Sequence, residues 1–380
     1  MSGTTQHAPE LRPLRDRVTA PSSLALPSAG EGLTWRPATP ADIGLIVDLK
    51  RAAGEVDHPR WLVTRDELEE EFKGESFDPE HDTAIALDAA GRAVAYGSAA
   101  APSSPETIVW VSLDGEVVPD RRGEGIGSAL LAWQEARGLQ HFAACDSVLP
   151  GWLASGANDN DAATIRLLEA HGYDRARWWL ELERDLAEPV AEVPTAPGVR
   201  LVPYGPQWQE RSRDAYNDAF RDHWGSQPAT AAEWAASDRL EASRPDLSVL
   251  AVTSAAPDTP DTPGAPGATG APDTPGAPDV AGAPDAERVV GFCFVDVAKD
   301  EWPLRGFPFG YVTAVGVRRD ARGQGLARTL LAHALRSLRA EGLDKAVLDV
   351  DAENPSGALG LYQSLGFTVG DRAVSLVKRF

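Results

Sequence analysis

Residues 311–331 read YVTAVGVRRDARGQGLARTLL and place a strand, a glycine-rich loop and the start of a helix in direct succession. The apolar, β-branched run at 311–317 is typical of a buried strand. After the loop, six aliphatic residues recur at helical spacing and predict one buried helix face: Leu326, Leu330, Leu331, Ala334, Leu335 and Leu338. This succession of elements predicts an α/β fold.

The loop itself has the composition of an anion-binding turn. Glycines let a backbone come close to a ligand, and the free amides at a helix N-terminus attract a pyrophosphate. No Gly-Lys-Ser/Thr follows, which argues against a P-loop, and the longer dinucleotide fingerprint is missing. The residues expected around the phosphates are Arg322, Gly323, Gln324, Gly325, Leu326, Ala327 and Arg328.

A second copy of this pattern lies about 200 residues earlier, where WVSLDGEV is followed by VPDRRGEGIGS at 118–128. Both copies contain Arg-x-x-Gly-x-Gly/Ala, and the helix after the first copy has Ile126, Leu130 and Leu131 on one face. A single copy can be an ordinary strand-to-helix turn, but two copies in one chain favour a ligand-binding loop. The corresponding residues of the first loop are Arg122, Gly123, Gly125, Gly127 and Ser128.

The length of 380 residues suggests two domains, and a Pro-rich segment at 187–197 separates two stretches of similar layout. We therefore expect a flexible extension at 1–32, an N-terminal domain at 33–186 and a C-terminal domain at 198–380. Residues 254–286 repeat variants of APDTPGAP and cannot build a core. Because the segments at 247–253 and 288–297 both read as strands, we interpret this piece as a disordered loop inserted between them.

The bulk composition narrows the classes of partner. A net charge of -21 disfavours nucleic acid and suits either a cationic substrate or simple solubility. Two distant cysteines, Cys145 and Cys293, form no disulfide framework and fit a cytoplasmic protein. No segment reads as a secretory signal or a membrane span, and the seven scattered histidines predict no metal site.

After the second loop a strand at 345–351 leads into ENPSGALGLYQSLGFTV. We expect Asn354 to cap the next helix and Gly366 to end it. The order of strand, loop, helix, strand, Asn, helix with Tyr362 and Gly-Phe resembles the GNAT superfamily of acyl-CoA-dependent N-acyltransferases over most of 198–380. The first half repeats it with Leu168 in the place of Tyr362, so the second half is the expected catalyst and the first a degenerate copy.

This resemblance implies two tandem GNAT domains, each a mixed, mainly antiparallel sheet flanked by helices, with acetyl-CoA as co-substrate. Its pantetheine arm would lie along Val315, Gly316 and Val317, and Asn354 would border the same site. Tyr362 would protonate the leaving thiolate; the alternative is a core aromatic. The two-domain layout is similar to that of the mycothiol synthases, which carry a glutamate where this chain has Tyr311, so Asp349, Asp351 or a water relay would replace that base.

The acceptor site in such folds is walled by the early helices, which here implicates Asp222, His223 and Trp224, although a packing tryptophan beside solvated polar residues explains them equally well. The resemblance implies direct attack of a small-molecule primary amine on the thioester in a ternary complex. A non-catalytic acyl-CoA-binding protein and a protein or peptide N-acetyltransferase remain the alternatives. The sequence does not indicate the acceptor, the acyl chain length or the oligomeric state.

Overall fold

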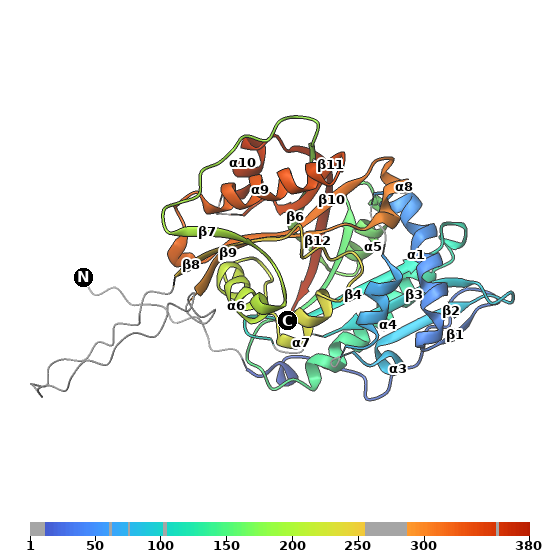
Figure 1. The fold of residues 1–380 in the computed structure, drawn as a ribbon. Helices are drawn as coiled ribbons and strands as arrows, with labels where there is room; N and C mark the ends of the chain where they lie inside the picture. The colour runs from blue at the N-terminus through green and yellow to red at the C-terminus, as the bar shows by residue number, and fades with distance from the viewer. Residues whose placement is uncertain (1–11, 61–62, 75–76, 102–104, 255–286, 355–356) are drawn as a thin grey trace, which may run out of the picture.

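The computed structural model describes residues 12–60, 63–74, 77–101, 105–254, 287–354 and 357–380 (Figure 1). The twelve strands of these residues form one continuous sheet in the order β1-β2-β3-β4-β5-β12-β6-β11-β10-β9-β8-β7. The pairs β4–β5 and β10–β11 are parallel and the other neighbours are antiparallel. The predicted α/β fold with mixed, mainly antiparallel strands is confirmed.

The first half of the chain supplies six strands and five helices. They are β1 Thr34–Arg36, α1 Ile43–Asp57, α2 Arg65–Glu71, α3 Pro79–Asp82, β2 Thr83–Leu87, β3 Ala93–Ala100, β4 Val109–Val117, α4 Ile126–Ala143, β5 Gly151–Asn158, α5 Ala162–Ala170 and β6 Asp174–Asp185.

The second half has the same order of strands and of long helices. Its elements are β7 Val199–Pro203, α6 Gln209–Phe220, α7 Ala231–Ser237, β8 Val249–Ser254, β9 Glu287–Asp296, α8 Trp302–Arg305, β10 Phe309–Val317, α9 Leu326–Ala340, β11 Lys345–Asp351, α10 Ala358–Ser364 and β12 Thr368–Arg379. Its short helix α8 lies between β9 and β10, whereas α3 precedes β2.

The strands on either side of the low-complexity segment are neighbours in the sheet. β8 and β9 pair antiparallel, with Val249 opposite Cys293 and Ser254 opposite Glu287. The prediction that these two segments form adjacent strands is therefore confirmed. Apart from Ser254, the proposed insertion at 254–286 lies outside the described residues.

The last strand of each half is placed in a way that the sequence did not suggest. β12 inserts between β5 and β6, while β6 pairs with β11 on its other side. Each half is therefore completed by the closing strand of the other. The division at 187–197 describes the order of the chain and stays a prediction, because the two halves share one sheet.

Residues 12–32, which we expected within a flexible extension, pack on the first half. Leu14 is fully buried in the cluster that contains Phe142, and its amide donates to the carbonyl of Ser147 at 2.8 Å. Arg17 donates to the carbonyl of Phe380 at 3.0 Å. Val18, Leu24 and Leu26 also pack against the apolar clusters of the first half, so several contacts hold this segment in place.

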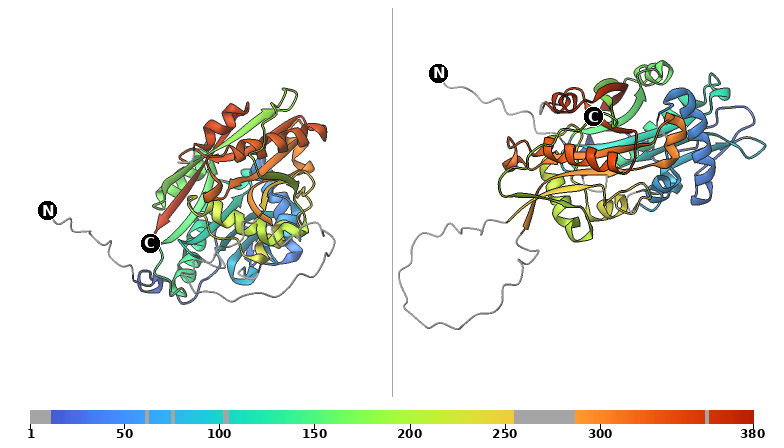
Figure 2. Two further views of the ribbon diagram at one scale, coloured as in Figure 1. Left: turned by 60° about the vertical axis from the view of Figure 1, so that its left-hand side comes forward. Right: turned by 45° about the horizontal axis from the view of Figure 1, so that its top comes forward.

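The second half buries both faces of its strands. The predicted apolar face of α9 is confirmed, since its leucines are at most 2% exposed and pack with Val290 and Val295 of β9. The side chains of Val289 and Phe292 join α6 on the opposite face. Figure 2 shows helices on both faces of the sheet, which leaves ligands access mainly where neighbouring strands separate.

Candidate active site

Each parallel strand pair opens part of the way along its length. The β10–β11 ladder ends at Tyr311 and Val347, while β10 continues along β9 to Val317. The β4–β5 ladder ends in the same way at Ser112 and Ala154. In the described chain the edges of β10 and β4 beyond these pairs have no strand partner on that side. An extended ligand can add to each edge as a further strand.

The two openings differ in the strand that borders them. The register of β10 shifts between Val312 and Ala314, so Thr313 is an extra residue opposite β9. β4 pairs with β3 in continuous register from Val117 to Ser112. A bulge re-aims backbone groups away from the regular ladder, and an amide so placed can stabilise a developing oxyanion. The second half has this feature and the first half does not.

The glycine loops have the same backbone conformation in both halves. Gly323 and Gly325 have φ values of +80° and +75°, and Gly123 and Gly125 have +82° and +79°. A Cβ atom added at any of these four positions would meet nothing within 4 Å. The helices α9 and α4 begin at the next residue in each half. Both loops therefore offer open space at a helix N-terminus, where an anion is stabilised.

The arginine of each motif holds its glycine loop in place by contacts with the preceding strand and with a helix of the same half. Arg322 donates to the carbonyls of Val317 at 3.3 Å and Ala219 at 2.9 Å. Arg122 donates to the carbonyl of Val117 at 3.1 Å and binds both carboxylate oxygens of Asp57, at 2.8 and 2.5 Å. These contacts tie the end of β10 or β4 to the end of α6 or α1, which gives both arginines a structural role.

The remaining residues of the second loop lie around the start of α9. Gly323, Gln324 and Gly325 are exposed, Leu326 is buried, and Ala327 and Arg328 are half-buried. Arg328 donates to the Ser364 hydroxyl at 2.9 Å. In the first loop, Gly123, Gly125 and Ser128 are exposed and Gly127 is half-buried. Their role as cofactor residues stays a prediction.

The Val-Gly-Val run of β10 is shaped by packing as well as by any ligand. A Cβ at Gly316 would lie 2.4 Å from the ring of Phe292, so only glycine fits there. Val315 and Val317 point to the other face and pack against the core under α9. Their backbone groups lie on the open side of β10, as the pantetheine prediction requires.

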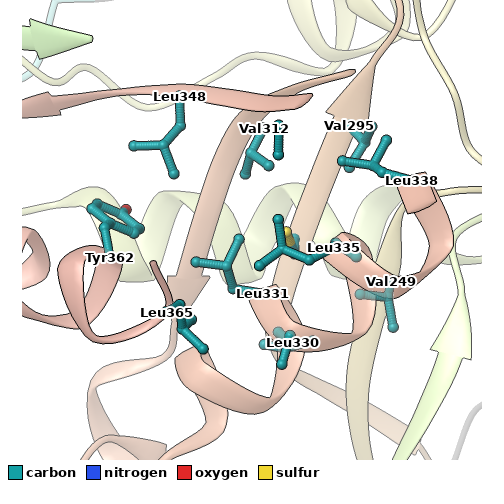
Figure 3. Close-up of a cluster of buried hydrophobic side chains, with 14 of the residues drawn as sticks. Val249, Val295, Val312, Leu330, Leu331, Leu335, Leu338, Leu348, Tyr362 and Leu365 are labelled. Atoms are coloured by element: carbon teal, nitrogen blue, oxygen red, sulfur yellow. The ribbon is translucent and has the colours of Figure 1, made fainter. Parts of the chain in front are cut away.

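Tyr362 points from α10 into the core beside the β10–β11 opening. Its side chain is 7% exposed and lies among Leu331, Leu348 and Leu365 (Figure 3). Burial, with a smaller contribution from Cys293, raises the pKa of the Tyr362 phenol above its ordinary value. The hydroxyl therefore keeps its proton at neutral pH. The position fits both the proposed acid and the core aromatic that the sequence left open.

The start of α10 differs from the expected one. The helix begins at Ala358, and Gly357, with a φ of +73°, occupies the N-cap position. The N-cap position expected for Asn354 therefore belongs to Gly357, and the backbone amide of Asn354 donates to the carbonyl of Asp351 at 3.1 Å. Residues 355 and 356, between Asn354 and the start of this helix, lie outside the described residues. The C-terminal end of the helix agrees with the prediction, since the helix ends at Ser364 and Gly366, two residues later, has a φ of +89°.

The first half contains an open cleft at its own loop. A cavity of about 400 Å³ extends from Gly123 and Gly125 along Val117 to α5. Leu168, the counterpart of Tyr362, is 2% exposed and forms part of its wall. The first half therefore has space for a ligand, but no tyrosine is among the described residues that line this cleft.

A larger cavity of about 1180 Å³ lies between the two halves. Its walls include Arg60 from the first half, Trp179 from β6, and both Tyr311 and Thr313 from β10. It shares Leu113, Gly115, Glu116, Ser155 and Thr164 with the first-half cleft. The central cavity therefore adjoins both strand openings.

Tyr311 and Asp349, two of the residues named from the sequence, meet at the point where β10 and β11 separate. The Tyr311 hydroxyl donates to Asp349 Oδ2 at 2.6 Å, and both residues line the central cavity. Loss of solvent around the carboxyl raises the pKa of Asp349 to about 6, against the opposing effect of the hydrogen bond. Burial also raises the pKa of Tyr311 well above its ordinary value. Asp349 is therefore mostly ionised at neutral pH and able to accept a proton.

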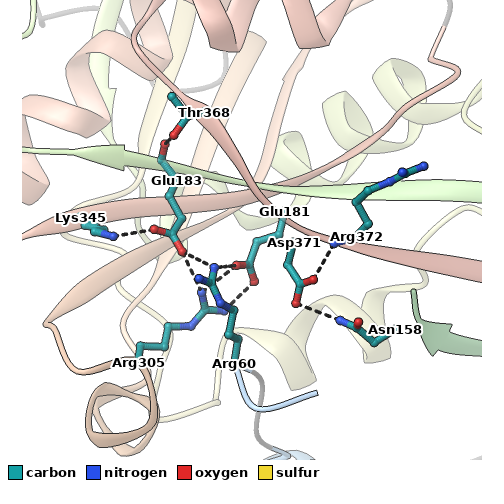
Figure 4. A network of polar contacts seen from close by, with 9 residues as sticks. All are labelled: Arg60, Asn158, Glu181, Glu183, Arg305, Lys345, Thr368, Asp371 and Arg372. Carbon is teal, nitrogen blue, oxygen red and sulfur yellow. Dashed lines mark hydrogen bonds and ion pairs between the residues drawn. The ribbon is translucent and has the colours of Figure 1, made fainter. Parts of the chain in front are cut away.

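A carboxylate from the first half lies directly beside this pair. Glu181 of β6 is opposite Asp349 of β11 in the sheet. Arg305 binds both of its carboxylate oxygens at 2.9 and 2.7 Å, and Arg60 contacts it at 3.3 Å (Figure 4). Sequence analysis missed Glu181, although Leu180 and Leu182 on either side already indicated that it faces away from the core.

The three residues predicted to bind the acceptor line neither cavity. Trp224 packs against Trp110 and Trp179, with ring centroids 5.1 and 6.3 Å away. His223 stacks on Trp179 at 5.9 Å, and Asp222 forms an ion pair with Arg319. These contacts favour the packing interpretation of Asp222, His223 and Trp224.

The described residues offer neither a ready metal site nor a membrane-spanning helix. They contain no group of three or more His, Cys, Asp or Glu side chains arranged to hold a metal ion. Within the same residues, no helix has the length and apolar character to cross a membrane.

Comparison with known proteins agrees with this geometry. The model of the acetyltransferase (GNAT) family matches residues 264–367. A mycothiol acetyltransferase of Thermobispora bispora is 30% identical over 336 residues, which cover 87% of this chain and 94% of that protein. The mycothiol acetyltransferase of Salinispora arenicola is 27% identical over 86% of this chain and 90% of its own length.

Two solved structures share the fold. A GCN5-related N-acetyltransferase from Sphaerobacter thermophilus has a TM-score of 0.63 at 23% identity and covers 93% of this chain and 97% of its own. A tandem GNAT protein from the clavulanic acid biosynthesis pathway has a TM-score of 0.60 at 17% identity, with coverages of 91% and 98%. The tandem arrangement thus recurs in solved structures.

Proposed function

Because this chain belongs to the GNAT family of acetyltransferases, we propose that it transfers the acetyl group of acetyl-CoA to the primary amine of a small molecule. The observation that carries the proposal is the Tyr311–Asp349 pair, which faces a cavity of about 1180 Å³ at the opening between β10 and β11. A proton acceptor, a strand opening and room for an acceptor coincide there.

The donor would lie in the opening of the second half. Its phosphates would bind the free amides around Gly323 and Gly325, and its pantetheine arm would pair with the open edge of β10. Arg322 would support this site indirectly, because its guanidinium holds the loop to α6. Neither role requires a rearrangement of the backbone.

The proposed reaction is a direct transfer. The acceptor arrives as an ammonium ion and gives a proton to Asp349, after which the free amine attacks the thioester carbonyl. The amide exposed by the bulge at Thr313 would stabilise the resulting oxyanion. As the C–S bond breaks, the Tyr362 hydroxyl would protonate the leaving sulfur, and the phenolate would regain a proton, through water, from the nitrogen of the intermediate, which becomes the neutral amide. Holding both substrates in one site supplies much of the rate.

The cavity favours a small acceptor over a protein. Its walls come from both halves, including Thr64 and Glu67 near α2, Trp110 of β4 and Ser375 of β12. An extended peptide would need an open groove, whereas a compact molecule can be surrounded. The name of the related mycothiol acetyltransferases makes the unacetylated precursor of mycothiol the first acceptor to test, beside a broad panel of amines.

The experiment is the substitution Tyr362→Phe, with free CoA release as the readout. We expect turnover to fall about tenfold to a hundredfold while acetyl-CoA affinity stays within about twofold, because only the proton donor is lost. Tyr173→Phe is the matched control, since Tyr173 is a buried tyrosine of the first half. Unchanged turnover would remove Tyr362 from the mechanism. Acetyl-CoA binding without CoA release for any amine would overturn the proposed function.

A further inference from the structure

Acidic side chains form a row across one face of the sheet, on the floor of the central cavity. Asp296 of β9 is opposite Tyr311 of β10, Asp349 of β11 is opposite Glu181 of β6, and Glu181 is opposite Asp371 of β12. Residues directly opposite each other in antiparallel strands project from the same face. The Tyr311 hydroxyl bonds to Asp349 and joins the two parts of the row. All five residues line the cavity.

The carboxylates in this row differ in how they are neutralised. Glu181 has Arg305 and Arg60 as cationic partners. Within the described residues, neither Asp296 nor Asp349 forms an ion pair with a basic side chain. Two carboxylates without an ion-pair partner in the described chain therefore flank the neutral Tyr311, and the charge of Arg305 offsets part of that of Asp349 but none of that of Asp296.

The surroundings of Asp296 add to this imbalance. Burial and the nearby charges of Glu67 and Asp238 raise the pKa of Asp296 to about 6. The basic side chain nearest to it in sequence, Lys299, is exposed. Lys299 and Arg244 also line this part of the cavity, but Arg244 is paired with Asp246 and Glu341 and Lys299 is exposed, so a ligand ammonium can still bind Asp296.

Resting on the proposed function, we propose that the acceptor carries two cationic groups: a primary amine that is acetylated beside Asp349 and a second ammonium that Asp296 binds. Asp296 is opposite Tyr311, and Asp349 lies two residues beyond Val347, the partner of Tyr311 on β11, so the Cα atoms of the two acids are about 12 Å apart and their side chains take up part of that distance. This spacing suits a short diamine.

The opposite direction along the row is less suitable for the second ammonium. Between Asp349 and Asp371 lies Glu181, which already carries two arginines. Asp371 also accepts a hydrogen bond from the Asn158 amide at 2.9 Å. Asp296 is therefore the specificity-determining carboxylate for a dicationic acceptor.

The test compares 1,4-diaminobutane with 1-aminobutane, which differ in one terminal ammonium. Free CoA release gives kcat/KM for each, and calorimetry on the full chain with CoA gives each Kd. We expect the diamine to be preferred by about tenfold in both measurements, because it gains a charge-assisted contact. In Asp296→Asn the ratio should fall close to one, and Asp296→Glu should restore part of it. Asp48→Asn, at an exposed position on α1, should keep the ratio of the unaltered protein.

The outcomes separate this inference from the proposed function. CoA release with equal kcat/KM for the two amines would overturn the inference and keep the function. Selective diamine binding without CoA release for any amine would overturn the function and keep the charge selectivity of the cavity. A diamine preference that survives in Asp296→Asn would show that another carboxylate provides it and would remove Asp296 from the assignment.

Discussion

The two halves of the chain share one layout but differ in the parts that perform chemistry. Both have a strand opening and a loop with two glycines at positive φ. The second half alone combines a bulge at Thr313 with Tyr362, whereas the first half has a regular strand and Leu168 among its described residues. A duplicated fold can thus keep the backbone that holds a ligand after its reacting side chains have changed.

The exchanged closing strands show why the first half is still needed. β6 places Glu181 opposite Asp349, and β12 separates β6 from β5. The wall of the proposed active site is therefore built from both halves. The difference between the halves can be tested by expressing each half alone, by matched substitutions in the two halves and by the pH dependence of turnover.

Separating the halves has the largest expected effect. A fragment of 1–186 loses β12, which leaves β5 with an open edge and β6 with no neighbour on either side. Open apolar edges favour aggregation. We expect fragments 1–186 and 187–380, expressed alone, to show no cooperative thermal unfolding by circular dichroism and to aggregate on gel filtration. A cooperatively folding monomer from 1–186 would show that the exchange is not required.

The next largest effect is expected when the same substitution is made in the glycine loop of each half. Gly325→Val places a β-branched residue at a φ of +75° and obstructs the proposed phosphate site, so turnover should fall by more than about a hundredfold. Gly125→Val imposes the same strain at +79° in the first half and should reduce turnover only a few-fold. Steady-state CoA release measures both. Equal losses would mean that the first loop takes part in catalysis.

Asp349→Asn should lower turnover by about a hundredfold, because the proposed proton acceptor is removed. Since the pKa of Asp349 is raised to about 6, the carboxylate form dominates above that pH. Turnover of the unaltered protein should therefore rise between pH 5 and 7 and then level off. In Asp349→Asn this rise should disappear. A rise that persists at the same pH would assign the titration to another group.

Local patterns in the sequence predicted the elements well. The spacing of leucines in 326–338 defined the buried face of α9, and the apolar runs around the low-complexity segment became the adjacent strands β8 and β9. The tyrosine at 311 and the acid at 349 were named separately, and the structure joins them in one hydrogen bond. These predictions depend on periodicity and composition, which are properties of short segments.

The strand exchange could not be predicted in this way. Whether β6 pairs with β5 or with β11 depends on contacts between residues far apart in the chain, and alternation alone does not choose a partner. The places of Glu181 and Asp371 in the acidic row follow from that pairing, so they were missed as well. Trp224 was named either as an acceptor-site residue or as a packing tryptophan, and its ring lies among other tryptophans.

The smallest expected difference concerns the two loop arginines. Arg122→Ala removes the charge partner of Asp57, whose side chain is 10% exposed, and should cost about 2 kcal/mol of unfolding free energy. Arg322→Ala removes hydrogen bonds to neutral carbonyls and should cost about 1 kcal/mol. Urea unfolding measures both. Asp57→Asn together with Arg122→Ala should recover part of the loss, because no buried charge then remains unpaired. If Arg322→Ala proved the more destabilising change, the carboxylate in the first half would not be what distinguishes the two anchors.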